Sequence, residues 1–236
     1  MDPVSEYKYG ESGPRFEHKE RHTKEDALSD FEFELLYEAA VRLPEEYYSL
    51  QAQFIVMVLG RLGLRRGELG HLESRWLNWD QKFISIPRHK DCDCGDCRLK
   101  AQQKVDHNEE IDFETAIAHR WHPKTETAIR DVPFSFSARV ELVLKRFFDR
   151  FDGWPHSSQT INRRLKRTAE NTDAVDSGSL YPHALRATAA SYHAGRGLGI
   201  LPLQSMFGWA DLVTPMKYVK ASGVNTAREL KMVHNR

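Results

Sequence analysis

The segment that most constrains the fold is QAQFIVMVLGRLG at residues 51–63, in which apolar residues occupy most positions. A helix that is apolar around most of its circumference is buried on most of its surface. The segment is too short to cross a membrane, since a spanning helix needs roughly 18 apolar residues, and no other apolar run approaches that length. The sequence therefore predicts a buried helix, and no membrane partner.

Most of the remaining chain also has helical spacing. Ser29 or Asp30 can cap a helix in which apolar residues recur up to Leu43, and Pro44 ends that helix. Further helices are expected at residues 65–77, 138–151, 160–171 and 184–195.

Two segments have the alternation of a β-strand instead. KFISIP at residues 82–87 is rich in aromatic and β-branched residues, and TAIRDVPF at residues 127–134 is expected to be its partner. The predicted fold class is therefore mostly α with a small antiparallel β-sheet (α+β).

The charges are unevenly distributed along the chain. The formal net charge is zero, but residues 139–236 hold 15 Lys and Arg against 8 Asp and Glu. The basic residues are densest in INRRLKRTAEN at residues 161–171. Phosphate contacts need a local basic face rather than a basic average. Residues 161–171 fit such a face, although an ordinary solvated helix face explains them equally well.

Three short motifs in the last third of the chain carry reactive side chains. His183 and Arg186 lie one helical turn apart, and Tyr218 follows Trp209 by nine residues. An imidazole, a guanidinium and a phenol in one place can bind a phosphate and attack it with the phenol. The motifs are HALRAT at 183–188, FGWAD at 207–211 and KYVKAS at 217–222.

Two further features accompany these motifs. Thr214 followed by Pro215 is a good helix start, which predicts a helix with Tyr218 on its first turn. GLRRGEL at residues 63–69 supplies an upstream arginine, which is Arg65 in this register. Each motif taken alone is weak, because histidine, arginine and tyrosine pairs at such spacings are common.

Together, and in this order, the motifs resemble the active site of the tyrosine recombinases (the integrase superfamily) from about Phe31 to the C-terminus. The resemblance implies that Arg65 and Arg186 bind the phosphate with bidentate, always-charged guanidinium groups. It implies that Tyr218 is the nucleophile, although a free phenol has a pKa of about 10 and needs a positive field to react. Lys124, just before the second strand, would be the general acid, and His183 would share acid–base duty.

Three other residues have expected places in this scheme. Trp209 stands where many family members have histidine, and its indole N–H can still donate to a phosphate oxygen. Glu68 matches an acidic position that orients an active-site group. Arg66 is the alternative to Arg65, but the Gly-Leu-Arg register favours Arg65.

The implied function is that of a site-specific DNA recombinase or integrase that forms a 3′-phosphotyrosine intermediate. One phosphodiester is exchanged for another, so neither ATP nor a catalytic metal is needed, and no Walker motif is present. The partner would be double-stranded DNA, bound as a homotetramer on paired sites and as a monomer or dimer without DNA. Two alternatives stay open: a type IB topoisomerase-like nicking-closing enzyme, and a catalytically silent DNA-binding module of the same fold.

The segment between the two expected strands, residues 88–122, is where the chain departs most from the family. It holds every cysteine of the chain, in the series His89, Cys92, Cys94 and Cys97, which has the ligand types of one structural zinc site. His107, His119 or His122 could replace His89. The alternative is a flexible acidic loop with reduced cysteines, since disulfides are rare in cytoplasmic proteins.

The ends of the chain complete the expected organisation. Residues 1–28 are a polar linker or disordered segment without the apolar region of a signal peptide, so a cytoplasmic location is expected. Residues 29–220 would be the catalytic domain. The family usually places a helical DNA-binding domain before it, so the chain is either a catalytic fragment or a minimal enzyme. Residues 221–236 resemble tails of archaeal, particularly haloarchaeal, integrases, and would dock on a neighbouring subunit.

Overall fold

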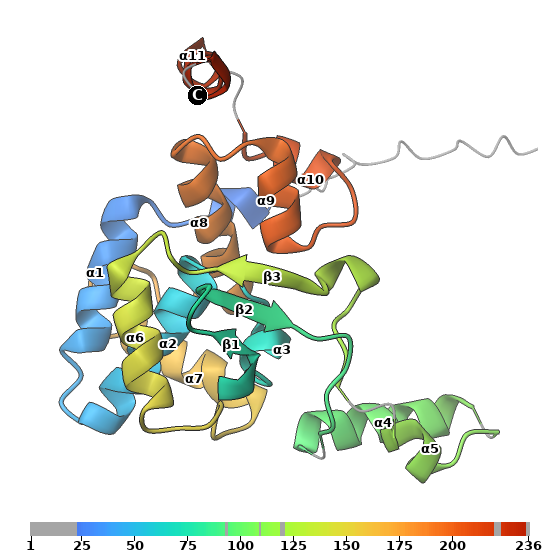
Figure 1. Cartoon of the computed structure of the whole chain (residues 1–236). Coiled ribbons are helices and arrows are strands. Elements are labelled where there is room, and N and C mark those ends of the chain that lie inside the picture. Colours follow the sequence, from blue (N-terminus) through green and yellow to red (C-terminus); the bar gives the residue numbers. More distant parts are fainter. Residues whose placement is uncertain (1–22, 93, 109, 119–120, 220–222, 235–236) are drawn as a thin grey trace, which may run out of the picture.

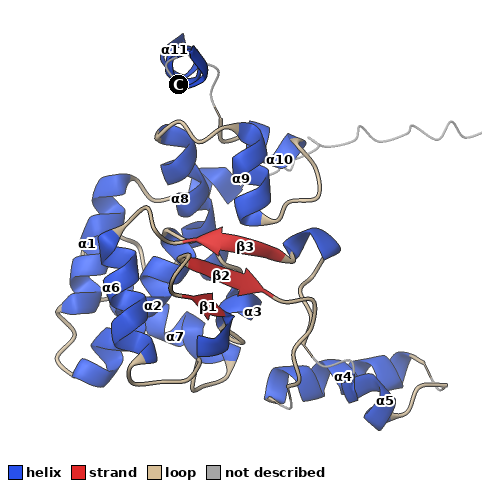
Figure 2. Cartoon of the chain, in the orientation of Figure 1, coloured by secondary structure: helices blue, strands red, loops and turns tan. Residues whose placement is uncertain are grey.

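The computed structural model describes residues 23–92, 94–108, 110–118, 121–219 and 223–234 (Figure 1). It confirms the predicted fold class, because helices surround one small antiparallel sheet (Figure 2). The elements are η1 Thr23–Asp26, α1 Asp30–Val41, α2 Glu46–Gly60, α3 Arg66–Leu69, η2 Ser74–Trp76, β1 Leu77–Asn78, β2 Phe83–Ile86, α4 Gly95–His107, α5 Phe113–Ala118, η3 Glu126–Ala128, β3 Arg130–Pro133, α6 Ala138–Phe148, α7 Ser158–Ala169, α8 Pro182–Gly195, α9 Ile200–Phe207, α10 Val213–Met216 and α11 Gly223–His234.

Helix α2 is the centre of the core, and it is buried, as residues 51–63 predicted. Every residue of α2 from Ser49 to Gly60 is buried, and the helix packs against α1, α6, α7 and α8. Phe54 of α2 stacks on Phe147 of α6, with ring centroids 3.6 Å apart. Figure 1 shows α1, α2 and α6 beside the sheet and α8 above it, next to α9.

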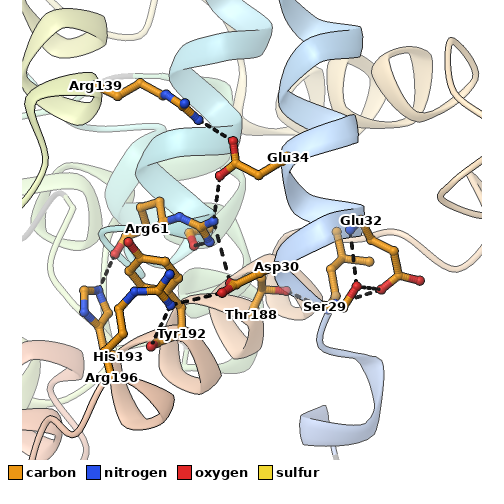
Figure 3. A network of polar contacts seen from close by, with 12 residues as sticks. Ser29, Asp30, Glu32, Glu34, Arg61, Arg139, Thr188, Tyr192, His193 and Arg196 are labelled. Carbon is orange, nitrogen blue, oxygen red and sulfur yellow. Dashed lines mark hydrogen bonds and ion pairs between the residues drawn. The ribbon is translucent and has the colours of Figure 1, made fainter.

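A polar network ties α1 to the end of α2 (Figure 3). Arg61, directly after α2, lies between the rings of Phe33 and Tyr192, 3.4 and 3.9 Å from their centroids. Its guanidinium pairs with Glu34 of α1 at 3.2 Å, and its carbonyl oxygen lies 2.8 Å from Nε2 of His193 in α8. The network fixes α1 and α8 on the two sides of the turn that leads to Arg65.

The sheet has the order β1-β2-β3, and both strand pairs are antiparallel. The predicted pairing of residues 82–87 with 127–134 is confirmed, with Ile84 opposite Val132 and Ile86 opposite Arg130. Strand β3 begins at Arg130 rather than at residue 127, because residues 126–128 form the 3₁₀ turn η3. The inward face carries buried Ile84 and Val132, and β3 contacts α9.

The segment between β2 and β3 contains two helices, α4 and α5, that the sequence analysis did not predict. They pack on each other and project from the end of the sheet (Figure 1). At their base, the backbones of Lys90 and Trp121 form a reciprocal pair of hydrogen bonds of 2.8 and 3.1 Å. The described residues include no helix long and apolar enough to cross a membrane, and residues 1–22 lie outside the description.

Candidate active site

Arg65 stands at the N-terminal cap of α3, where its backbone is extended. The carboxylate of Glu68 accepts from the backbone N–H of Arg65 at 2.7 Å and from its Nη1 at 2.9 Å. Nη2 of Arg65 donates to the carbonyl oxygen of Gly208 at 2.9 Å. The Arg65 side chain is partly buried, whereas the neighbouring Arg66 side chain is exposed.

Arg186 of α8 reaches the same place from the other side. Only 3% of its surface is exposed. Its guanidinium donates to the carbonyl oxygens of Gly63 and Phe207. Burial, followed by the positive charge of Arg65, lowers the pKa of Arg186 to about 9, so the group is still protonated at neutral pH. The two arginines therefore hold successive carbonyls of one turn, at residues 207 and 208.

Glu68 and Arg130 form the buried base of the site, and sequence reasoning missed Arg130. Arg130 donates to both carboxylate oxygens of Glu68, at 2.9 and 3.0 Å, and its Nε donates to the carbonyl oxygen of Met206 at 2.7 Å. Burial alone would raise the pKa of Glu68, but Arg130, Arg186 and Arg65 outweigh it and bring the pKa to about 2. Strand alternation could have revealed Arg130, because it shares the inward face of β3 with Val132.

The turn after α9 also carries the aromatic part of the site. Gly208 has a left-handed conformation with φ of 59°. The ring of Trp209 stacks between Phe207, at 4.8 Å, and Tyr218, at 5.5 Å and 8° between planes. The guanidinium carbon of Arg186 lies 5.9 Å from the Trp209 ring centroid. Tyr218 is thus connected to Arg186 through one indole ring.

Tyr218 lies at a different place relative to helix α10 than the sequence predicted. Helix α10 begins at Val213 and ends at Met216, so Tyr218 follows the helix instead of standing on its first turn. The N-cap residue is Leu212 rather than Thr214, and the backbone N–H of Thr214 donates to the side chain of Asp211 at 2.9 Å. Burial raises the pKa of Tyr218, and the charge of Arg186 opposes that rise.

His183 and Lys124 lie at the open edge of this group. Desolvation, then the charges of Arg186, Arg65 and Lys124, lowers the pKa of His183, which places the imidazole within electrostatic range of all three cations. The Lys124 side chain is exposed and lines a cavity of about 680 Å³ together with His89 and His122. Contacts at the turn of residues 207–209 link four of these residues: Arg65, Arg186, Trp209 and Tyr218. The link between His183 and the nearby cations, Lys124 among them, is electrostatic.

The arrangement is suited to binding an anion. Each guanidinium has five N–H donors. Arg65 and Arg186 each use two groups on the protein bonds described above. Each arginine therefore keeps N–H donors that could bind an anion. The site also has one buried carboxylate, that of Glu68, among several cations, so its charge beside the phenol of Tyr218 is positive.

A second group of reactive side chains lies at the base of the α4–α5 segment. One ligand atom from each of His71, Cys92, Cys94 and Cys97 lies within 4.8 Å of the others, and such a group could hold a metal ion. The Nε2 atom of His71 is 3.4 Å from the sulfur of both Cys94 and Cys97. Its Nδ1 lies 2.7 Å from the carbonyl oxygen of Gly67, so Nδ1 must carry the proton and Nε2 the lone pair.

The structure brings His71, and not the predicted His89, together with the three cysteines. The Nζ atom of the neighbouring Lys90 lies 3.2 Å from the carbonyl oxygen of His71. His89 is exposed. His71 could not be found from local spacing, because it is distant from the cysteines in sequence. His107 and His122 are not in the group, and His119 lies outside the described residues.

Comparisons with known proteins give a family match and solved structures of similar fold. Residues 26–223 match the phage integrase family. The fold is similar to that of XerA recombinase, at 20% identity and a TM-score of 0.56 over 89% of this chain and 65% of that chain. It is also similar to the Tn1549 transposon integrase in complex with transposon right end DNA, at 17% identity and a TM-score of 0.56 over 89% of this chain and 66% of that chain. The same integrase with circular intermediate DNA gives 18% identity and a TM-score of 0.57 over 88% and 66%.

These likenesses establish a shared fold. The chain spans 65% and 66% of the length of the solved structures that it resembles. No curated protein matches the sequence.

Proposed function

Because the chain belongs to the phage integrase family, we propose that it is a site-specific DNA recombinase that cuts and rejoins DNA through a 3′-phosphotyrosine intermediate. The observation that carries this proposal is the turn at Phe207–Trp209. Its carbonyl oxygens bind Arg186 and Arg65, and its indole ring stacks on Tyr218. Two phosphate-binding groups and a nucleophile therefore converge on three consecutive residues.

Arg65 and Arg186 would bind the non-bridging oxygens of the scissile phosphate. Charge on these oxygens increases in the transition state, and guanidinium groups that are already fixed stabilise it without reorganisation. Glu68 fixes Arg65 at 2.9 Å, and backbone carbonyls fix Arg186. Trp209 would hold the ring of Tyr218 in line and offer its indole N–H to the phosphate.

The proton transfers require an acceptor for the phenol and a donor for the leaving group. His183, whose pKa is lowered by desolvation and by the neighbouring cations, would accept the proton of Tyr218. The phenolate oxygen attacks phosphorus, the bond from phosphorus to the 5′ oxygen breaks, and Lys124 would protonate that oxygen. Rejoining reverses these steps, and no nucleotide cofactor is consumed.

The partners and setting follow from the same proposal. The solved Tn1549 integrase structures contain DNA, which supports double-stranded DNA as the substrate here. We propose a homotetramer on paired sites, a monomer or dimer without DNA, a cytoplasmic location, and an origin among archaeal integrases. Residues 29–220 would form the catalytic domain with an insertion at 88–122. Residues 221–236 would dock on a neighbouring subunit, for which α11 offers exposed Leu230, Met232 and Val233.

We also propose that His71 and the three cysteines hold one structural zinc ion. Three thiolates and one imidazole are a closed tetrahedral donor set that zinc favours, and it leaves no open position for catalysis. Ideal zinc–sulfur bonds of about 2.3 Å place sulfur atoms roughly 3.8 Å apart. The observed limit of 4.8 Å between ligand atoms is close enough for small side-chain movements to complete the site.

A covalent-capture assay tests the enzymatic proposal. Wild-type protein is incubated, without ATP, with a pool of nicked duplexes of randomised sequence, and protein–DNA adducts that resist denaturation are isolated and sequenced. The account predicts adducts at the 3′ phosphate on a restricted set of sequences. Adducts that form without sequence preference would indicate the topoisomerase-like alternative, and reversible binding alone would indicate a DNA-binding module.

A further inference from the structure

The proposed metal site connects two parts of the active site that are far apart in sequence. Its three cysteines belong to the segment that leads to Lys124, whereas His71 follows the helix α3 that carries Glu68. We infer that the metal centre, with its metal ion bound, positions Lys124. It holds the segment that leads to Lys124 against helix α3, whose N-terminal cap is Arg65. This inference rests on the proposed function.

The connection to the Arg65 helix runs through the imidazole of His71. Its Nδ1–H donates to the carbonyl oxygen of Gly67 at 2.7 Å, and Gly67 lies between Arg65 and Glu68. A metal-bound histidine commonly donates its other N–H to a carbonyl in this way, which fixes both its tautomer and its ring orientation. The ring of His71 is therefore pre-oriented by α3 itself, with Nε2 directed at the cysteine sulfurs.

The connection to Lys124 runs through Trp121. The indole of Trp121 is buried and stacks on the His71 ring, with centroids 5.0 Å apart and planes at 19°. The Trp121 backbone pairs with Lys90 at the base of the insertion, and Lys90 forms an ion pair of 2.5 Å with Glu73. Lys124 follows Trp121 by three residues, after buried Pro123. Fixing His71 thus fixes the point from which the Lys124 side chain extends.

The insertion has little apolar material of its own to maintain this arrangement. The buried residues of α4 are Cys97 and Ala101, and that of α5 is Ala116. A segment with so small a core depends on a metal for its order, because metal binding replaces buried apolar area. Arg65, in contrast, is also held by Glu68 and Gly208. Metal loss is therefore expected to displace Lys124 while leaving Arg65 in place.

A substrate with a different leaving group distinguishes the effect of a displaced Lys124 on cleavage from defects in phosphate binding or in the nucleophile. In a substrate with sulfur in place of the bridging 5′ oxygen, the leaving thiolate needs no protonation, since thiols have a pKa of about 8.5. A defect confined to the general acid then disappears, whereas a defect in phosphate binding or in the nucleophile persists. The substrates would use a DNA sequence recovered by covalent capture with wild-type protein.

The variants are His71→Ala, His71→Cys, Lys124→Ala and the matched control His89→Ala, which removes an exposed histidine outside the metal group. Zinc content, DNA affinity and single-turnover cleavage are measured on the full chain. We expect wild type and His89→Ala to hold one zinc per chain. His71→Ala should lose zinc. Like Lys124→Ala, it should cleave the oxygen substrate at least roughly 10²-fold more slowly than wild type does. It should cleave the sulfur substrate close to the wild-type rate. His71→Cys keeps four ligands but removes the ring that bonds to Gly67 and stacks on Trp121, so it should retain zinc and remain slow on the oxygen substrate.

Two results would overturn the inference: retention of zinc and rate in His71→Ala, or equal slowing of that variant on both substrates. Failure of the proposed function is distinct, because wild type would then form no adduct with either substrate. A Lys124→Ala variant that is equally slow on both substrates would remove Lys124 as the acid and with it the inferred role of the metal.

Discussion

The ion pair between Glu68 and Arg130 predicts a large, pH-dependent loss of stability in the variant Glu68→Gln. Glu68 is 2% exposed and accepts hydrogen bonds from both Arg130 and Arg65. Glutamine keeps the size of the side chain but removes its charge. The variant therefore reproduces the protonated form of Glu68 at every pH.

The magnitude follows from the pKa of Glu68, which falls from 4.5 to about 2 on folding. Each pKa unit corresponds to about 1.36 kcal/mol, so the ionised carboxylate contributes about 3 kcal/mol to the free energy of unfolding at pH 7. Because the folded-state pKa is depressed, this contribution is complete above pH 4.5 and is lost as the pH falls from 4.5 towards 2. The difference between wild type and Glu68→Gln should shrink over the same window.

Urea unfolding followed by tryptophan fluorescence at pH 7, 5, 4 and 3 measures this difference. The matched control is Glu38→Gln, which breaks an exposed pair with Arg42 of 2.8 Å and should cost less than about 1 kcal/mol. A Glu68→Gln loss below about 1 kcal/mol at pH 7, or one that does not change between pH 5 and pH 3, would refute the reasoning.

Three other predictions concern single residues of the site. Gly208→Ala should lower the free energy of unfolding by about 1–3 kcal/mol, because φ is +59° and the added Cβ would lie 2.7 Å from the carbonyl oxygen of Thr127. Gly195→Ala is the control, since its Cβ would have nothing within 4 Å. Equal melting temperatures of the two variants would contradict the prediction. Arg65→Ala should slow single-turnover cleavage at least about 10²-fold, whereas Arg66→Ala, at an exposed position, should stay within a few-fold of wild type; the reverse order would assign the wrong arginine. Wild-type cleavage should rise with pH through a pKa below 6.5, as the lowered pKa of His183 requires for a proton acceptor, and His183→Gln should remove that rising limb; an unchanged profile would exclude this role.

A local period or spacing was informative in most segments, but the helix expected at residues 65–77 is only the four-residue α3, followed by η2 and β1. The apolar run at residues 51–63 predicted the buried helix α2, and alternation predicted the pairing of β2 with β3. Helices α4 and α5 were missed because they bury very few apolar residues, and an amphipathic period needs a buried face to be visible.

The candidate site shows the same division between local and long-range information. Arg186 and Tyr218 follow from motif spacing, which is local. His71 was missed because only the fold brings it near the cysteines. Arg130 has a local signal in the alternation of β3, and only its pairing with Glu68 depends on the fold. His89 was chosen because it was the nearest histidine in sequence, but it is exposed and lies outside the group that His71 forms with the cysteines.

The most direct test of the central claim is covalent capture with Tyr218→Phe, which removes only the phenolic oxygen. Tyr47→Phe is the matched control, since the Tyr47 hydroxyl contacts His156 at 3.0 Å and takes no part in the proposed chemistry. Wild type and Tyr47→Phe should form denaturation-resistant adducts whose DNA-linked peptide contains Tyr218. Tyr218→Phe should bind the same DNA with wild-type affinity and form no adduct; adduct formation by Tyr218→Phe at the wild-type rate would contradict the account.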